Sequence, residues 1–279
     1  MNVKKEAQGI QGTKQEFLKV FREMCYSRSS WQVWADLISA MACSLANSTD
    51  PDKTGKTYLD REKEYQQCVE RLGGVEKPAE CLGVIVQALE SDPEQDFLGA
   101  LYMELELGNH WKGQFFTPYS VCKMMSKIVA GDVDSQIKKK GYISVCDPAC
   151  GAGATLISTA NEMKQSKYNF QKHVLFVGQD IDRVAGLMCY IQLSLLGCAG
   201  YICIGNTLTN PLWGYDLFPQ EKEGQELWIM PMFHTEPWIW RRLFGYFDYA
   251  GKVNVKKPES KRYYMIFDFE KEEMKWEKR

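Results

Sequence analysis

Residues 143–155 read Ile-Ser-Val-Cys-Asp-Pro-Ala-Cys-Gly-Ala-Gly-Ala-Thr, a short apolar run followed by an acid and two closely spaced glycines. Its first residues suit a short strand, Asp147 stands at the strand end, and two glycines precede a helix that starts near Ala154. Glycines let the backbone approach a ligand closely, and a helix N-terminus offers amide groups. The spacing is neither the Gly-x-Gly-x-x-Gly of dinucleotide enzymes nor a phosphate-binding loop. An ordinary tight turn is the alternative interpretation.

Strands and helices alternate after this stretch. The pattern predicts strands over 173–177, 201–204 and 227–230, with helices over 154–163 and 183–196. Such alternation is typical of a parallel, doubly wound α/β sheet. Ligands in these sheets bind at the carboxyl ends of the strands.

The residues before the sheet predict a series of helices. Ser29 begins a Ser-x-x-Gln capping box, and an apolar stripe from Trp31 to Leu45 follows it. Asp92-Pro93 predicts the start of another helix. We expect a helical N-terminal domain over 1–112 and a Rossmann-like domain over 113–279.

Composition excludes several classes of protein. The 279 residues are 45% hydrophobic and 25% charged, which argues against a disordered chain, and their formal net charge of -2 favours no general attraction to nucleic acid. We expect no membrane-spanning segment and no secretory signal. Ten scattered cysteines with no Cys-x-x-Cys spacing predict reduced thiols, no metal site and a cytoplasmic location.

Polar groups also follow the next two predicted strands. Asp180 precedes Ile181 at the end of the second strand, where a carboxylate can accept both hydroxyls of a ribose. Asn206 follows the third strand, where an amide can pair with an adenine edge. Three strand ends therefore offer groups that suit an amino acid tail, a sugar and a base, as in S-adenosylmethionine.

Three segments carry a resemblance to a known family: residues 96–102 (Asp-Phe-Leu-Gly-Ala-Leu-Tyr), 113–118 (Gly-Gln-Phe-Phe-Thr-Pro) and 147–153. Together they resemble the N6-adenine DNA methyltransferases, and more narrowly the modification subunit of type I restriction systems. The resemblance covers roughly 78–233. It implies an S-adenosylmethionine-dependent methyltransferase fold behind a helical domain, methyl transfer to adenine N6 in DNA, and a partner subunit that supplies specificity.

The resemblance assigns cofactor-binding roles to three groups of residues. The Phe-Thr-Pro segment resembles the element that folds over the methionine end of the cofactor, Asp180 matches the ribose-binding acid, and Asn206 stands where the family usually has aspartate. The expected cofactor-binding residues are Phe116, Thr117, Pro118, Asp147, Pro148, Ala149, Gly151, Gly153, Asp180, Ile181, Asn206, Thr207 and Leu208.

The family's catalytic motif, Asn/Asp-Pro-Pro-Tyr/Phe at the fourth strand end, is not complete in this sequence. Met230, Pro231 and Phe233 form one candidate remnant, in Met230-Pro231-Met232-Phe233 after the fourth predicted strand. The alternative, Asn210-Pro211-Leu212-Trp213, keeps an amide through Asn210, a proline through Pro211 and an aromatic ring through Trp213. We favour the first. Methionine accepts hydrogen bonds weakly, so activation of the adenine amino group should largely fail.

Two functional hypotheses follow. The first is a methyltransferase-like protein that binds S-adenosylmethionine and methylates adenine in DNA poorly. The second is a catalytically inactive subunit that binds DNA or a catalytic partner protein and regulates it. Residues 234–279 are too few for three further strands, a crossover helix and a target-recognition region, so we expect a shortened sheet. One strand is predicted over 263–269, with 253–255 as its candidate partner.

Overall fold

The structure is a computed structural model that describes residues 3–26, 28–107, 116–129, 133–212, 214–215, 217–252, 263–268 and 273–278. The chain forms two compact units, residues 1–239 and 240–279. The predicted domain boundary near residue 112 lies outside the described residues and stays a prediction. None of the described helices is long and apolar enough to cross a bilayer.

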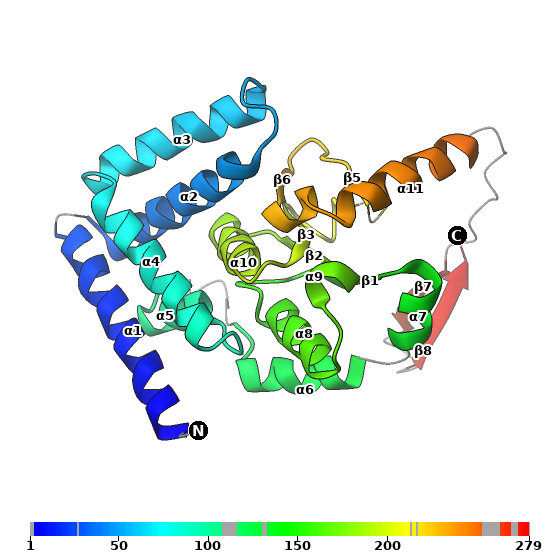
Figure 1. Cartoon of the computed structure of the whole chain (residues 1–279), viewed down its shortest axis with the longest axis horizontal. Coiled ribbons are helices and arrows are strands. Elements are labelled where there is room, and N and C mark those ends of the chain that lie inside the picture. Colours follow the sequence, from blue (N-terminus) through cyan, green and yellow to red (C-terminus); the bar gives the residue numbers. More distant parts are fainter. Residues whose placement is uncertain are drawn as a thin grey trace. The chain divides into compact units, whose positions relative to one another are not determined.

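The helices and strands follow one another along the chain as Figure 1 shows. The helices are α1 (Val3–Met24), α2 (Ser30–Thr49), α3 (Lys56–Leu72), α4 (Glu76–Ser91), α5 (Phe97–Glu104), α6 (Tyr119–Val129), α7 (Val133–Lys140), α8 (Ala154–Gln165), α9 (Phe170–His173), α10 (Arg183–Leu195), the 3-10 helix η2 (Pro231–His234) and α11 (Trp238–Lys252). The strands are β1 (Ile143–Asp147), β2 (Val174–Asp180), β3 (Ala199–Ile204), β4 (Gly214–Tyr215), β5 (Phe218–Pro219), β6 (Glu226–Ile229), β7 (Tyr263–Asp268) and β8 (Glu273–Lys278).

Helices α1 to α5 form the N-terminal region, and α1, α2 and α5 share an aromatic core. Phe17 contacts Trp34 and Phe97 edge to face, with ring centroids 5.9 and 6.2 Å apart. Ser29 caps α2 as predicted, because its hydroxyl accepts the Gln32 amide at 3.3 Å. The predicted helix start at Asp92 is wrong, since α5 begins after Asp96. Asp92 instead follows the last residue of α4, and its carboxylate accepts the Glu94 amide at 2.8 Å in the turn between the two helices.

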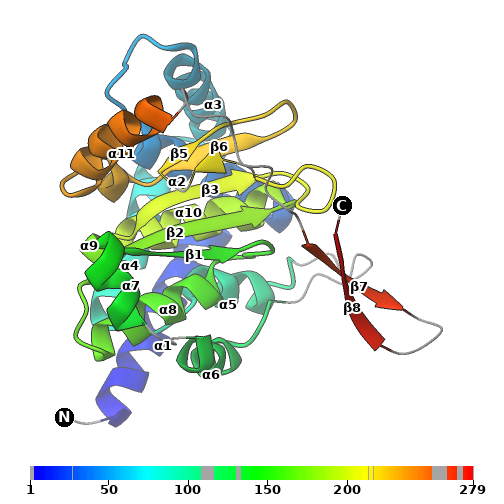
Figure 2. The same cartoon turned by 90° about the vertical axis from the view of Figure 1, so that its right-hand side faces the viewer.

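The main sheet has the strand order β1-β2-β3-β6 (Figure 2). Strands β1, β2 and β3 are parallel, as predicted, whereas β6 runs antiparallel to β3. A parallel connection needs a crossover, usually a helix. The described residues of 205–225 contain only the two short strands β4 and β5, so the chain returns along β3 instead. The α/β fold with a helical region before a shortened Rossmann-like sheet is therefore confirmed, with a correction in the fourth strand.

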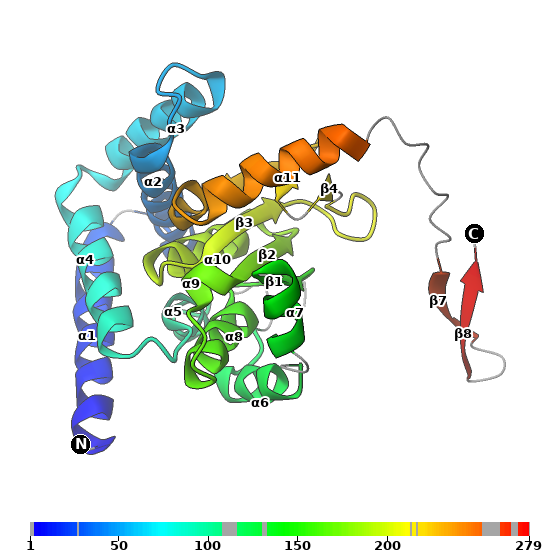
Figure 3. The same cartoon turned by 45° about the vertical axis from the view of Figure 1, so that its right-hand side comes forward.

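Helices α8 and α10, which connect the parallel strands, cover one face of the sheet (Figure 3). Phe176 and Ile202 point to this face and join the core that continues into the helical region. The other face carries a smaller core, in which Val177 and Tyr201 pack with Phe233. Strand β1 ends the sheet, and along it exposed and half-buried residues alternate.

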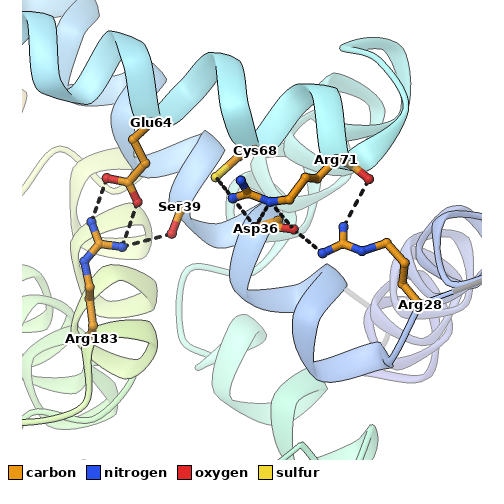
Figure 4. A network of polar contacts seen from close by, with 7 residues as sticks. All are labelled: Arg28, Asp36, Ser39, Glu64, Cys68, Arg71 and Arg183. Carbon is orange, nitrogen blue, oxygen red and sulfur yellow. Dashed lines mark hydrogen bonds and ion pairs between the residues drawn. The ribbon is translucent and has the colours of Figure 1, made fainter.

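Polar contacts of Arg183, the first residue of α10, connect this helix with the helical region (Figure 4). The Arg183 guanidinium donates to Glu64 of α3 at 3.0 Å and to Ser39 of α2 at 3.0 Å. It also donates to both carboxylate oxygens of Glu226 on β6 at 2.9 Å. A second group lies nearby, where Asp36 accepts from Arg71 and Arg28 at 2.6 Å each.

These contacts predict the effect of removing the Arg183 charge. We expect Arg183→Met to lower the free energy of unfolding by about 1–3 kcal/mol, because Glu64 and Glu226 lose their shared cation. The three side chains are one third to nearly one half exposed, which limits the loss. Urea unfolding measures it. The control is Lys77→Met, whose pair with Glu23 is more exposed and should change stability by under about 0.5 kcal/mol. Equal effects would contradict the prediction.

The second unit contains a two-stranded hairpin. Strand β7 confirms the strand predicted over 263–269. Among the described residues its partner is the antiparallel β8. The predicted partner, 253–255, lies outside the described residues and stays a prediction. The pairing places Tyr263 opposite Lys278 and Asp268 opposite Glu273.

Candidate functional site

Three turns meet at the carboxyl ends of β1, β2 and β3. The Cys150 amide donates to the Gln179 carbonyl at 3.0 Å, and the Gly205 amide donates to the Asp180 carbonyl at 2.8 Å. The Thr207 hydroxyl donates to the Pro148 carbonyl at 2.6 Å. The structure therefore brings together the three turns that the sequence singled out.

The glycine turn needs its glycines for two reasons. Gly151 and Gly153 have φ angles of +53° and +99°, which residues with a side chain rarely adopt. A Cβ atom on Gly153 would also lie 2.8 Å from the Cys189 sulfur of α10. Helix α8 begins at Ala154 without a side-chain cap, so its first amide groups lie next to this turn.

Asp180 joins the glycine turn to the second strand end. Its carboxylate accepts the Gly151 amide at 2.8 Å and the Asp182 amide at 2.9 Å. Burial raises the pKa of this carboxyl above its ordinary value, although both amide bonds oppose the shift. Asp147 accepts the Ala149 amide at 3.1 Å and closes its own turn. Two acids thus shape the backbone of this edge, and a carboxylate retains further acceptor capacity.

Asn206 shapes the third turn. Its side-chain oxygen accepts the amides of Leu208 at 2.9 Å and Thr209 at 3.1 Å. The predicted adenine contact through this oxygen therefore competes with its own turn, while the NH₂ group can donate to a ligand. Ile181 and Leu208 expose 70% and 93% of their surface, which leaves apolar area at the second and third strand ends.

Phe116, in the segment before α6, lies against the glycine turn. Its ring would be 3.1 Å from a Cβ atom on Gly151, and it contacts the Tyr102 ring at a centroid distance of 5.3 Å. Pro118 accepts the Val121 amide at 2.9 Å at the start of α6, and the Thr117 carbonyl accepts the Cys122 thiol at 3.8 Å. Phe116 of the Phe-Thr-Pro segment thus lies beside the glycine turn, and the predicted contact of this segment with the cofactor stays a prediction.

Met230 and its neighbours lie elsewhere, so their predicted placement beside the cofactor residues is wrong. Strand β6 is antiparallel, and its end lies at the amino ends of the parallel strands, where the Met230 amide donates to the Gly200 carbonyl at 2.9 Å. Met230 is buried, Pro231 starts η2, and Phe233 packs 6.1 Å from the Tyr201 ring. Met230 belongs to the larger core and Phe233 to the smaller core on the other face of the sheet.

The alternative remnant lies at the expected edge. Asn210 and Pro211 follow the third turn, and Pro211 lines a cavity of about 280 Å³ together with Pro148 and Thr207. The Asn210 carbonyl already accepts from Gln179 at 3.0 Å and from a second glutamine, Gln225, at 2.8 Å.

Further bonds occupy the same remnant. The Asn210 side-chain NH₂ group donates to the Glu223 carbonyl at 3.1 Å, and the Pro211 carbonyl accepts from Lys222 at 2.9 Å. Trp213 lies outside the described residues. The observed bonds make these two residues part of the loop structure.

Two glutamines near the site were not predicted from the sequence. Gln179 donates to the carbonyls of Gly205 and Asn210 and accepts the Leu212 amide at 2.9 Å, which fixes the segment after β3. Gln192 contacts the carbonyl of Ala152 in the glycine turn. Each stands in an apolar strand or helix, so a polar residue within a buried stripe was the available signal.

Comparisons with known proteins identify a family for most of the chain. A family model described as N-6 DNA Methylase matches residues 95–265, more than half of the chain. A solved structure, the type I restriction-modification system methyltransferase subunit from Streptococcus thermophilus, is similar at 14% identity with a TM-score of 0.37. The match covers 74% of this chain and 60% of that one, so the chain spans less than two thirds of that subunit. Curated proteins gave no match.

Proposed function

Because the chain belongs to the N-6 DNA methylase family, we propose that it binds S-adenosylmethionine at the carboxyl ends of β1, β2 and β3 and takes part in adenine methylation of DNA. One observation carries the proposal. The Asp180 carboxylate binds the Gly151 amide at 2.8 Å, so the acid of one strand end and the glycine turn of its neighbour form one continuous surface.

The groups at this edge fit the parts of the cofactor. Asp180 can accept the ribose hydroxyls, since each of its oxygens uses only one observed bond. The exposed apolar side chains of Ile181 and Leu208 can cover the flat, apolar face of the base, and removing this surface from water favours binding. Phe116 lies against the glycine turn. The methionine end of the cofactor would bind there through backbone amides.

The hydrogen-bond acceptors that the adenine amino group needs are what limits methyl transfer at this site. S-adenosylmethionine supplies a methyl group on a sulfonium centre, but the amino nitrogen of adenine attacks well only when nearby oxygens accept its hydrogens. Met230 lies at the opposite edge, and the main-chain carbonyls of Asn210 and Pro211 already accept protein donors. We therefore propose a cofactor-binding subunit that depends on a partner chain for efficient methyl transfer.

A second candidate function is methyl transfer by this chain alone. It is favoured by the position of Asn210 and Pro211 on the same side of the sheet as Asp147 and Asp180. In that case Asn210→Ala abolishes transfer of labelled methyl groups to adenine-containing DNA. Under the leading proposal the isolated chain transfers methyl groups only inefficiently, and the substitution does not change that rate.

Calorimetric titration with S-adenosylmethionine tests the cofactor proposal. We expect saturable binding in the wild type and its loss in Asp147→Ala, because this acid closes the first turn. The matched control, Asp134→Ala, removes an exposed acid of α7 and should bind as the wild type does. A folded wild type that releases no heat would contradict the proposal.

A further inference from the structure

Gln192 is a fully buried amide in the middle of α10. Its NH₂ group donates to the Asp96 carboxylate at 2.8 Å and to the Ala152 carbonyl at 2.9 Å. Its oxygen accepts the Leu98 amide at 3.0 Å. Both donors and the acceptor of one side chain are therefore used, and no water is needed to satisfy them.

These three bonds join segments that are far apart in the sequence. Asp96 caps α5 of the helical region, where it also accepts the Gly99 amide at 2.8 Å. Ala152 lies between the two glycines of the turn after β1 and is buried. Gln192 thus connects the start of α5 directly with the glycine turn.

The glycine turn has a particular need for such an anchor. Gly151 and Gly153 flank Ala152 with positive φ angles, and glycine gives an unanchored backbone many other conformations. The Gly151 amide must face Asp180 for the two strand ends to form one surface. A fixed Ala152 carbonyl removes much of the freedom that a ligand would otherwise have to restrict.

We propose that Gln192 is a positioning residue that holds the glycine turn in its ligand-binding conformation and makes the helical region part of the cofactor site. The inference rests on the proposed function where it concerns the cofactor. The hold on the turn itself is a property of the protein without ligand. The two parts can therefore be measured separately.

The test compares Gln192→Met with Leu193→Ala in the full chain. Methionine has nearly the same length and no amide, so it removes all three bonds while filling the space. Leu193 is the next residue of α10, equally buried, and its truncation lowers stability through a cavity. Amide hydrogen exchange of residues 149–153 and titration with S-adenosylmethionine are measured on both variants.

We expect Gln192→Met to speed exchange in the turn and to weaken cofactor binding about tenfold or more, the effect of losing roughly one hydrogen bond's free energy. Leu193→Ala should lower the melting temperature while leaving turn exchange and affinity within about twofold of the wild type. Unchanged exchange in Gln192→Met, or equal changes in both variants, would overturn the inference.

Two further outcomes are distinguished. A folded wild type that does not bind S-adenosylmethionine defeats the proposed function, while exchange still decides whether Gln192 holds the turn. Should Gln192→Met not fold, Gln192→Asn replaces it. The shorter amide cannot reach Asp96 and Ala152 together, so exchange in the turn should still rise. No rise in that variant would refute the positioning role.

Discussion

Gly200→Ala is expected to prevent stable folding of the sheet. Gly200 lies in β3 with a φ angle of +144°, opposite Phe176 of β2. An added Cβ atom would lie 1.8 Å from the Phe176 carbonyl oxygen and 2.9 Å from its nitrogen, so it would collide with backbone that cannot rotate away. We expect a loss above about 4 kcal/mol, a large part of the stability of an ordinary domain.

Thermal unfolding followed by circular dichroism measures this effect. The matched control is Gly83→Ala in α4, where a new Cβ atom meets nothing within 4 Å. That substitution should be neutral or should stabilise the protein by up to about 1 kcal/mol, because alanine favours helix. A Gly200→Ala variant that melts close to the wild type would show that β2 and β3 do not pair as described.

Asp180→Asn is expected to weaken S-adenosylmethionine binding about 100-fold. A charged acceptor contributes about 1.5–3 kcal/mol to each hydrogen bond, and two ribose hydroxyls are involved in the proposed complex. The NH₂ group of the asparagine would also face the backbone N–H of either Gly151 or Asp182, so that one of these two hydrogen bonds would be lost. Calorimetric titration gives the affinity.

The control for this substitution makes the same chemical change two residues away. Asp182 caps α10 by accepting the Ala185 amide at 2.9 Å, and asparagine caps helices equally well. Asp182→Asn should therefore keep its affinity within about threefold. Equal losses in both variants would mean that the turn as a whole, rather than the Asp180 carboxylate, sets the affinity.

The raised pKa of Asp180 adds a pH dependence to this prediction. In the unfolded chain an aspartate is ionised above about pH 3.9. Burial moves the pKa of Asp180 in the folded protein above that value. Ionised Asp180 therefore costs stability at neutral pH, and this cost is relieved as pH falls through its folded pKa. Cofactor affinity should fall over the same range because the protonated acid loses acceptor capacity. Asp180→Asn should remove that part of the dependence, and Asp182→Asn should retain it.

Local sequence determined much of this protein. The strand, glycine turn and helix over 143–165, the capping serine Ser29 and the acid Asp180 at the next strand end were all predicted where the structure has them. These features depend on side-chain periodicity, backbone preferences and capping groups within a few residues, which a single sequence contains. The shared edge of three parallel strands then followed from their alternation with helices.

Only the tertiary structure decided what depends on partners far along the chain. The direction of β6, and with it the removal of Met230 from the site, was set by a connection without a described helix and by hydrogen bonds to β3. The partners of Gln192 were decided only by the packing of α10 against Asp96 and Ala152. An isolated segment is apolar or polar by composition, but its direction and its buried partners are properties of the packing between segments.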